Sequence, residues 1–164
     1  MGRRDELEAE LQLSWDDDTL AIYADQLQLE GDPRGELIAL DLRGAGEEAR
    51  VRRGELLRAW LGTSIGVWWD PDHATWYAGD PSKRGNTWVT FDRGFVEILN
   101  LGTDELDSTS AVVRSFLAGP GGPYVRRLSI SGLTEELCPA LAALMKLQRP
   151  WLKHLAIRRM HPVT

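Results

Sequence analysis

The chain has 164 residues, 43% of them hydrophobic and 27% charged, which is ordinary for one globular domain with a substantial core. Its net charge is −6 and its pI is about 5.1. This balance argues against nucleic acid or an anionic membrane as the main partner, because both are bound through an excess of Lys and Arg. A basic protein partner remains compatible with it.

The single cysteine, Cys138, rules out an internal disulfide and fits a reducing compartment, so we expect a cytoplasmic protein. Residues 1–13 are charged and lack the apolar core of a signal peptide, and no apolar run is long enough to span a bilayer. The three histidines stand alone, without metal-ligand spacing, so we expect neither a metal nor a cofactor.

The first third of the chain has helical periodicity. An amphipathic helix is predicted over 3–13, and a second over 19–27, where four apolar residues recur on one face. The acidic run 16–18 precedes the second helix, and we expect Asp18 to cap it while the other carboxylates complement the helix dipole. A divalent-metal site is the alternative for this run, but the run lacks the spacing of an EF-hand loop.

Gly31 is suited to end the second helix, and Asp32 and Pro33 are suited to begin a third as its N-cap and first residue. The third helix stops near Gly44. A fourth helix is predicted over 47–61, with these residues facing inward: Val51, Leu56, Leu57, Trp60 and Leu61.

The polar residues Asp25, Asp32, Arg34 and Glu36 have two interpretations. In the structural one, Asp32 caps a helix and Arg34 bridges two helices by pairing with Asp25 or Glu36. In the functional one, Asp25 and Glu36 are paired catalytic carboxylates and Arg34 clamps an anion. The structural interpretation is favoured, because capping alone explains these residue types.

From residue 63 the pattern alternates, which predicts strands over 65–69, 75–78 and 87–91. Five of the seven tryptophans fall in this part of the chain, between residues 60 and 88. Core packing accounts for Trp60 and Trp88. Alternation puts aromatic residues on both faces of a strand, so one or two of a further set should be exposed and available as interface hot spots. The set is Trp68, Trp69, Trp76 and Tyr77.

Three later segments share one pattern: aromatic, aliphatic, polar, any residue, Leu, small polar, aliphatic. They are 95–101, 124–130 and 151–157, and their starts lie 29 and 27 residues apart. Such a period is typical of leucine-rich-repeat-like solenoids. Helices predicted over 108–118 and 134–149 would connect these strands, which are therefore expected to be parallel. Variable positions would line a polar face suited to protein recognition: Glu97, Asn100, Arg126, Arg127, Ser129, Lys153, His154 and Ala156.

The segments Leu20–Leu27 and Gly31–Ile38 together resemble the bacterial repeat-companion domain, whose consensus contains Tyr-Ala-Asp-Trp-Leu followed by Gly-Asp-Pro-Arg-Gly-Glu. Members of that family continue with an Arg-Gly-Phe-Val-Glu segment, which Arg93–Glu97 matches, and with leucine-rich-repeat-like strands. This chain departs in having Gln26 for the usual Trp and a shorter link between the third and fourth helices. The resemblance implies the architecture and no activity, and it assigns structural roles to Tyr23, Asp25, Asp32, Pro33, Arg34, Gly35 and Glu36.

These observations predict a single α/β domain over 1–164. A helical cap (1–62) packs on a mixed sheet, in which antiparallel aromatic-rich strands (63–92) lead into about three parallel leucine-rich-repeat-like βα units (93–164). The predicted function is a non-catalytic protein-binding module. Its alternatives are an immunity or antitoxin-like protein that neutralises a basic toxin, and a small enzyme that uses Asp25, Arg34 and Glu36. The candidate binding residues are Trp68, Trp69, Trp76, Tyr77, Glu97, Arg126, Arg127, Lys153 and His154.

Overall fold

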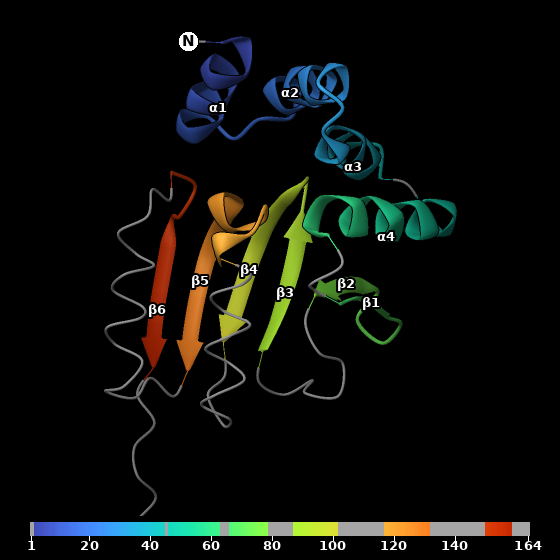
Figure 1. The fold of residues 1–164 in the computed structure, drawn as a ribbon, viewed down its shortest axis with the longest axis vertical. Coiled ribbons are helices and arrows are strands. Elements are labelled where there is room, and N and C mark those ends of the chain that lie inside the picture. The colour runs from blue at the N-terminus through green and yellow to red at the C-terminus, as the bar shows by residue number, and fades with distance from the viewer. Residues whose placement is uncertain are drawn as a thin grey trace, which may run out of the picture. The chain divides into compact units, whose positions relative to one another are not determined.

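Helices come first in the chain and strands follow (Figure 1). The computed structural model describes residues 2–44, 46–62, 66–78, 87–101, 117–131 and 150–158. Within them the helices are α1 (Arg3–Leu13), α2 (Asp17–Leu29), α3 (Pro33–Leu42) and α4 (Glu47–Leu61). The strands are β1 (Val67–Asp70), β2 (Thr75–Ala78), β3 (Thr87–Asp92), β4 (Phe95–Leu101), β5 (Val125–Ser131) and β6 (His154–Arg158), and a short 3-10 turn covers Gly122–Tyr124. The predicted mixed α/β class is confirmed.

The chain divides into two compact units. The helical unit comprises residues 1–62 together with 92–95, which form the turn between β3 and β4. The sheet unit comprises residues 63–91 and 96–164. Each unit has its own buried apolar residues, and each is described separately below.

Local sequence explains where the helices begin and end. The Asp16 carboxylate accepts the Thr19 N–H at 2.8 Å and caps α2. The prediction that Asp18 caps this helix is therefore wrong, because α2 begins before residue 18. Gly31, with φ +75°, follows the end of α2, and Asp32 caps α3 by accepting the Arg34 N–H at 3.0 Å.

The core of the helical unit is built from one face of each helix. The buried residues follow the helical period predicted from the sequence. Val51 is an exception, since it is exposed on α4 although it was expected to face inward. Phe95, at the start of β4, is fully buried and belongs to the same unit. The principal buried side chains are Leu7, Leu11, Leu20, Tyr23, Leu27, Leu37, Ile38, Leu56, Leu57, Trp60 and Leu61.

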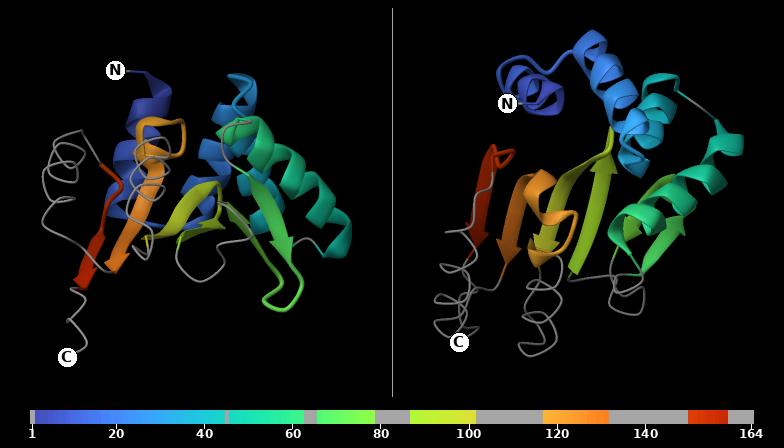
Figure 2. Two further views of the ribbon diagram at one scale, coloured as in Figure 1. Left: turned by 60° about the horizontal axis from the view of Figure 1, so that its bottom comes forward. Right: turned by 45° about the horizontal axis from the view of Figure 1, so that its top comes forward.

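The strands follow one another across the sheet in sequence order. β1 and β2 form an antiparallel pair, which the register pair Ala78↔Val89 links to β3. The other four strands form a mixed set, in which β3 runs opposite to β4, while β4, β5 and β6 are parallel (Figures 1 and 2).

The three segments that share one sequence pattern lie side by side as β4, β5 and β6. Their register pairs equivalent positions, so that Leu99, Leu128 and Leu155 are neighbours across the strands. Leu99 and Leu128 are buried, whereas Leu155 and Ile157 on β6 are 46% and 48% exposed. The predicted crossover helices over 108–118 and 134–149 lie outside the described residues, apart from residues 117 and 118.

Candidate functional site

Arg34 is at the centre of the polar residues singled out by the sequence. Its side chain is fully buried and donates to the Asp32 carboxylate at 2.9 Å and to the Tyr23 hydroxyl at 3.2 Å. The Tyr23 hydroxyl in turn donates to Glu8 at 2.6 Å. The Arg34 guanidinium lies 5.9 Å from the Tyr23 ring centroid and 5.7 Å from that of Trp60, within the range of cation–π attraction. Arg34 therefore links all four helices.

The expected partners of Arg34 were wrong. Arg34 pairs with Asp32 instead of Asp25 or Glu36. Glu36 accepts two hydrogen bonds from Arg52, at 2.6 and 2.7 Å, and Asp25 is exposed on α2. The three residues of the catalytic interpretation thus have separate surroundings and are not drawn together around one reacting position.

The carboxylate pKa values in this unit follow from structural partners. Burial alone would raise the pKa of Asp32, but the hydrogen bonds and charge of Arg34, with the charge of Arg4, outweigh it and lower that pKa. The hydrogen bonds from Arg52 lower the pKa of Glu36. Burial raises the pKa of Asp41, against the opposing effect of Arg53. The Asp41 carboxylate is engaged by the Arg53 side chain and by the Arg93 N–H at 2.8 Å.

The turn between β3 and β4 joins the motif around Arg34. Gly94 has φ +70°, and a Cβ there would lie 2.6 Å from Ile38 Cγ1 and 3.1 Å from the Arg34 carbonyl oxygen. The Arg93 side chain donates to Asp17 at 2.6 Å. Phe95 meets the Trp15 ring edge to face, with centroids 4.9 Å apart. The two motifs that carry the family resemblance therefore pack against each other, a proximity that their separation in sequence concealed.

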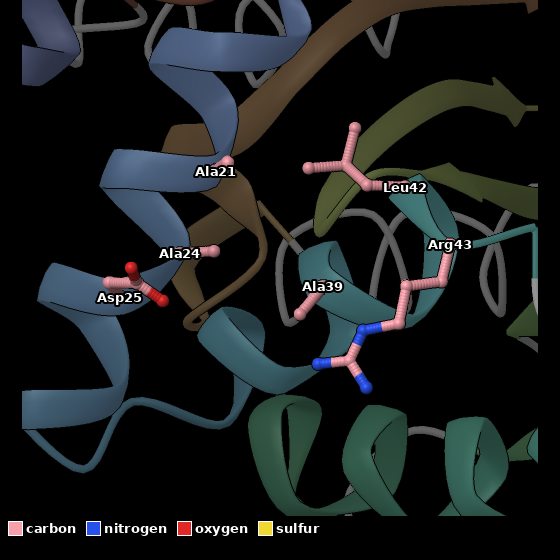
Figure 3. A pocket seen from close by; sticks show the side chains of 6 residues that line it. All are labelled: Ala21, Ala24, Asp25, Ala39, Leu42 and Arg43. Carbon is pink, nitrogen blue, oxygen red and sulfur yellow. The ribbon is translucent and has the colours of Figure 1, made fainter.

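A pocket of about 220 Å³ opens between α2 and α3 (Figure 3). Alanines from both helices line it, and the charged side chains of Asp25 and Arg43 reach into the same space from opposite helices. Sequence reasoning missed this pocket. Its only signal was small residues at helical spacing in α2. The lining residues are Ala21, Ala24, Asp25, Ala39, Leu42 and Arg43.

The aromatic residues of the sheet unit form two contact groups. Trp68 stacks on Tyr77 at 4.8 Å between centroids, and Tyr77 meets the edge of Trp88 at 6.1 Å. Trp69 lies 5.6 Å from Trp76. Trp76 is 8% exposed, so its proposed place on a binding surface is wrong, whereas Trp68, Trp69 and Tyr77 are half-buried. Trp88 was expected in the core and is also half-buried.

The candidate residues on the parallel strands reach solvent to different degrees. Glu97, Arg127, Lys153 and His154 are exposed, and Arg126 is half-buried. Arg127 and His154 are direct neighbours across β5 and β6, and the Lys153 N–H donates to the Arg126 carbonyl at 2.8 Å. The exposed side chains of Arg127 and His154 are therefore adjacent on one face of the sheet.

Comparisons with protein-family models, with curated proteins and with solved structures found no match. In the part of the chain that the structure describes, no three His, Cys, Asp or Glu residues are grouped so that they could hold a metal ion. The described helices include none that combines the length and apolar character needed to cross a membrane.

Proposed function

We propose that this chain is a non-catalytic protein-binding module, built on leucine-rich-repeat-like strands and recognising its partner through one face of β4, β5 and β6. The observation that carries the proposal is the register of these strands. Equivalent positions lie beside one another. Leu99, Leu128 and Leu155 form one row, in which the first two are buried, and chemically different residues occupy the rows on either side.

The positions on either side of the leucine row are half-buried or exposed, and they differ from strand to strand as a recognition surface requires. One row across the strands is Ile98, Arg127 and His154, and the next is Asn100, Ser129 and Ala156. These rows mix an aliphatic group, a guanidinium, an imidazole, an amide and a hydroxyl. Such variety provides both hydrogen bonding and apolar contact, as protein interfaces do. The half-buried aromatics Trp68, Trp69 and Tyr77 supply further contact area on the same sheet unit.

The non-catalytic part of the proposal is supported by the surroundings of the polar residues around Arg34. Arg34 is enclosed by Asp32, Tyr23 and Trp60, and Glu36 is held by Arg52. Both side chains have structural partners that account for their presence. The resemblance to the repeat-companion domain is part of the same proposal and implies a scaffold role for these residues.

The charge distribution favours an immunity or antitoxin-like protein as a second candidate. The helical unit contains 16 Asp and Glu against nine Lys and Arg, a net charge of −7, and the sheet unit has a net charge of +1. A surface with that excess of carboxylates attracts a basic protein and accelerates its association. A basic toxin would be such a partner.

Site-directed photo-crosslinking tests the sheet-face proposal. A photoreactive amino acid placed at Arg127 should capture one protein from the native cell extract, and the same amino acid at Arg3 on α1 should not. With the captured protein purified, Arg127→Glu combined with His154→Glu should weaken its binding at least about tenfold, whereas the control Arg3→Glu should leave it unchanged. Equal capture at both positions, or unchanged binding by the double variant, would contradict the proposal.

A further inference from the structure

The solvent-facing side of α2 carries apolar residues that the helical core does not use. Ile22 is 49% exposed and Leu29 is 84% exposed. They lie seven residues apart, which is two helical turns, and so share one face. Asp18 and Asp25 are exposed on the same face, at positions four before and three after Ile22. The result is a stripe in which carboxylates and aliphatic side chains alternate along the helix.

The pocket between α2 and α3 opens beside this stripe, and Asp25 belongs to both (Figure 3). Its volume of about 220 Å³ accommodates one large aliphatic side chain, which would meet the alanines and Leu42 and leave Asp25 and Arg43 on either side. Arg43, on the opposite side, lies close enough to Glu36 to lower the pKa of that carboxyl, although the hydrogen bond from Arg52 lowers it more.

We propose that this face of α2 and α3, defined by Asp18, Ile22, Asp25, Leu29 and the pocket, docks a lysine- and arginine-rich amphipathic helix of a protein partner. One aliphatic side chain of that helix enters the alanine-lined pocket, and its neighbours cover Ile22 and Leu29. Basic side chains then lie opposite Asp18 and Asp25. The inference rests on the proposed protein-binding function and assigns to it a surface on the helical unit.

The negative charge of the helical unit favours a basic helix on this face over an acidic or purely apolar one. The helical unit carries a net charge of −7, so a basic segment gains attraction over the whole unit as well as at the two aspartates. A bound amphipathic helix would bring anchors at the same three-, four- and seven-residue spacing, so that its side chains could meet Ile22, Leu29 and the pocket in turn. A groove between two packed helices is the geometry into which a third helix fits.

A labelled synthetic peptide tests the inference on the full chain. The probe has roughly 18 residues, enough for several helical turns, with leucines on one face and lysines on the other. Fluorescence anisotropy should show saturable binding below about 1 mM. Ala21→Leu fills the pocket and should weaken binding at least about tenfold, which corresponds to about 1.4 kcal/mol. Asp25→Lys should weaken binding similarly, and a peptide with glutamates in place of lysines should not bind the parent chain, whose helical unit keeps its excess of carboxylates.

Matched changes on α1 serve as controls. Ala9→Leu and Glu10→Lys alter an exposed alanine and an exposed carboxylate of the same unit and should leave peptide binding unchanged. All variants should keep the thermal midpoint of the parent chain. Absence of saturable binding, or equal weakening by the control pair, would overturn this inference alone if the Arg127-dependent partner is still bound. Loss of that partner with retained peptide binding would instead overturn the sheet-face proposal.

Discussion

Arg34 and Gly35 show how two adjacent residues of one motif do different structural work. Arg34 satisfies polar groups of several helices inside the core, and Gly35 allows α2 and α3 to approach. A Cβ at residue 35 would lie 2.5 Å from the Ala24 carbonyl oxygen and 2.7 Å from the Gln28 amide nitrogen. Both atoms are backbone, so the helices themselves would have to separate.

Replacing Arg34 should destabilise the fold. Arg34→Ala removes the hydrogen bonds to Asp32 and Tyr23 and the stacking on Trp60, and we expect it to lower the free energy of unfolding by about 3 kcal/mol. Arg34→Lys keeps the charge but loses the planar fork, so its effect should be intermediate. Urea denaturation followed by tryptophan fluorescence measures both.

The exposed Arg3, which pairs with Glu6 on the surface, is the matched control for that experiment. Arg3→Ala should change the free energy of unfolding by less than about 0.5 kcal/mol. If Arg34→Ala folded as stably as the parent chain, the scaffold role would be refuted and the catalytic interpretation of Arg34 would regain support.

At the scale of elements, the sequence predicted the helices and strands well where local chemistry decides them. The Asp32–Pro33 start of α3 and Gly31 after α2 both follow from caps and backbone preferences. The repeat pattern predicted three related strands, and the helices expected between them predicted their parallel direction, which β4, β5 and β6 have. Each of these features depends on residues close together in sequence or on a repeated spacing.

The ion-pair partner of Arg34 and the buried face of β2 could not be predicted from the sequence in the same way. The residue types allow Arg34 to pair with Asp25, Asp32 or Glu36. In the structure Asp32, the N-cap of the same helix, is the partner, while Arg52 engages Glu36. Alternation in β2 shows that Trp76 and Tyr77 face opposite sides, but it does not say which side is covered. Which of Trp76 and Tyr77 is buried depends on what other elements pack against β2.

The leucine ladder provides a prediction at this scale. Leu128 is 1% exposed, and its neighbour Leu155, at the equivalent repeat position on β6, is about half exposed. Leu128→Ala should therefore cost about 2–5 kcal/mol of unfolding free energy. Leu155→Ala should cost about 1 kcal/mol or less, because less apolar surface is withdrawn from water. Thermal denaturation of the two variants provides the comparison, and equal losses would show that burial does not differ along the ladder.

For the molecule as a whole, the pKa values of its carboxylates predict how the stability of the fold responds to acid. Hydrogen bonds and nearby cations lower the pKa values of several carboxylates, namely Asp16, Glu30, Asp32, Glu36 and Asp70. Such groups stabilise the fold above their unfolded pKa, and the stabilisation is lost as the pH falls through the folded value. Asp41, whose pKa is raised, acts in the opposite sense.

Among the described residues, five carboxylates have a lowered pKa and Asp41 has a raised one, so the chain should lose stability on acidification. The loss should begin near the ordinary pKa values of 4.5 for Glu and 3.8 for Asp and continue below them. The thermal midpoint should fall as the pH is lowered from neutral to about pH 2. The midpoint of the Asp32→Asn variant should fall less steeply than that of the parent chain. A midpoint that stays level over this interval would contradict the assignment of these ion pairs.

The register of β5 and β6, which places equivalent repeat positions side by side, also affects how the chain tolerates substitution. A substitution at Arg127 or His154 removes none of the hydrogen bonds that pair β5 with β6, because those hydrogen bonds join main-chain atoms alone. On the proposed protein-binding function, single substitutions at these two positions would change which partner is recognised while the strand pairing stays as it is.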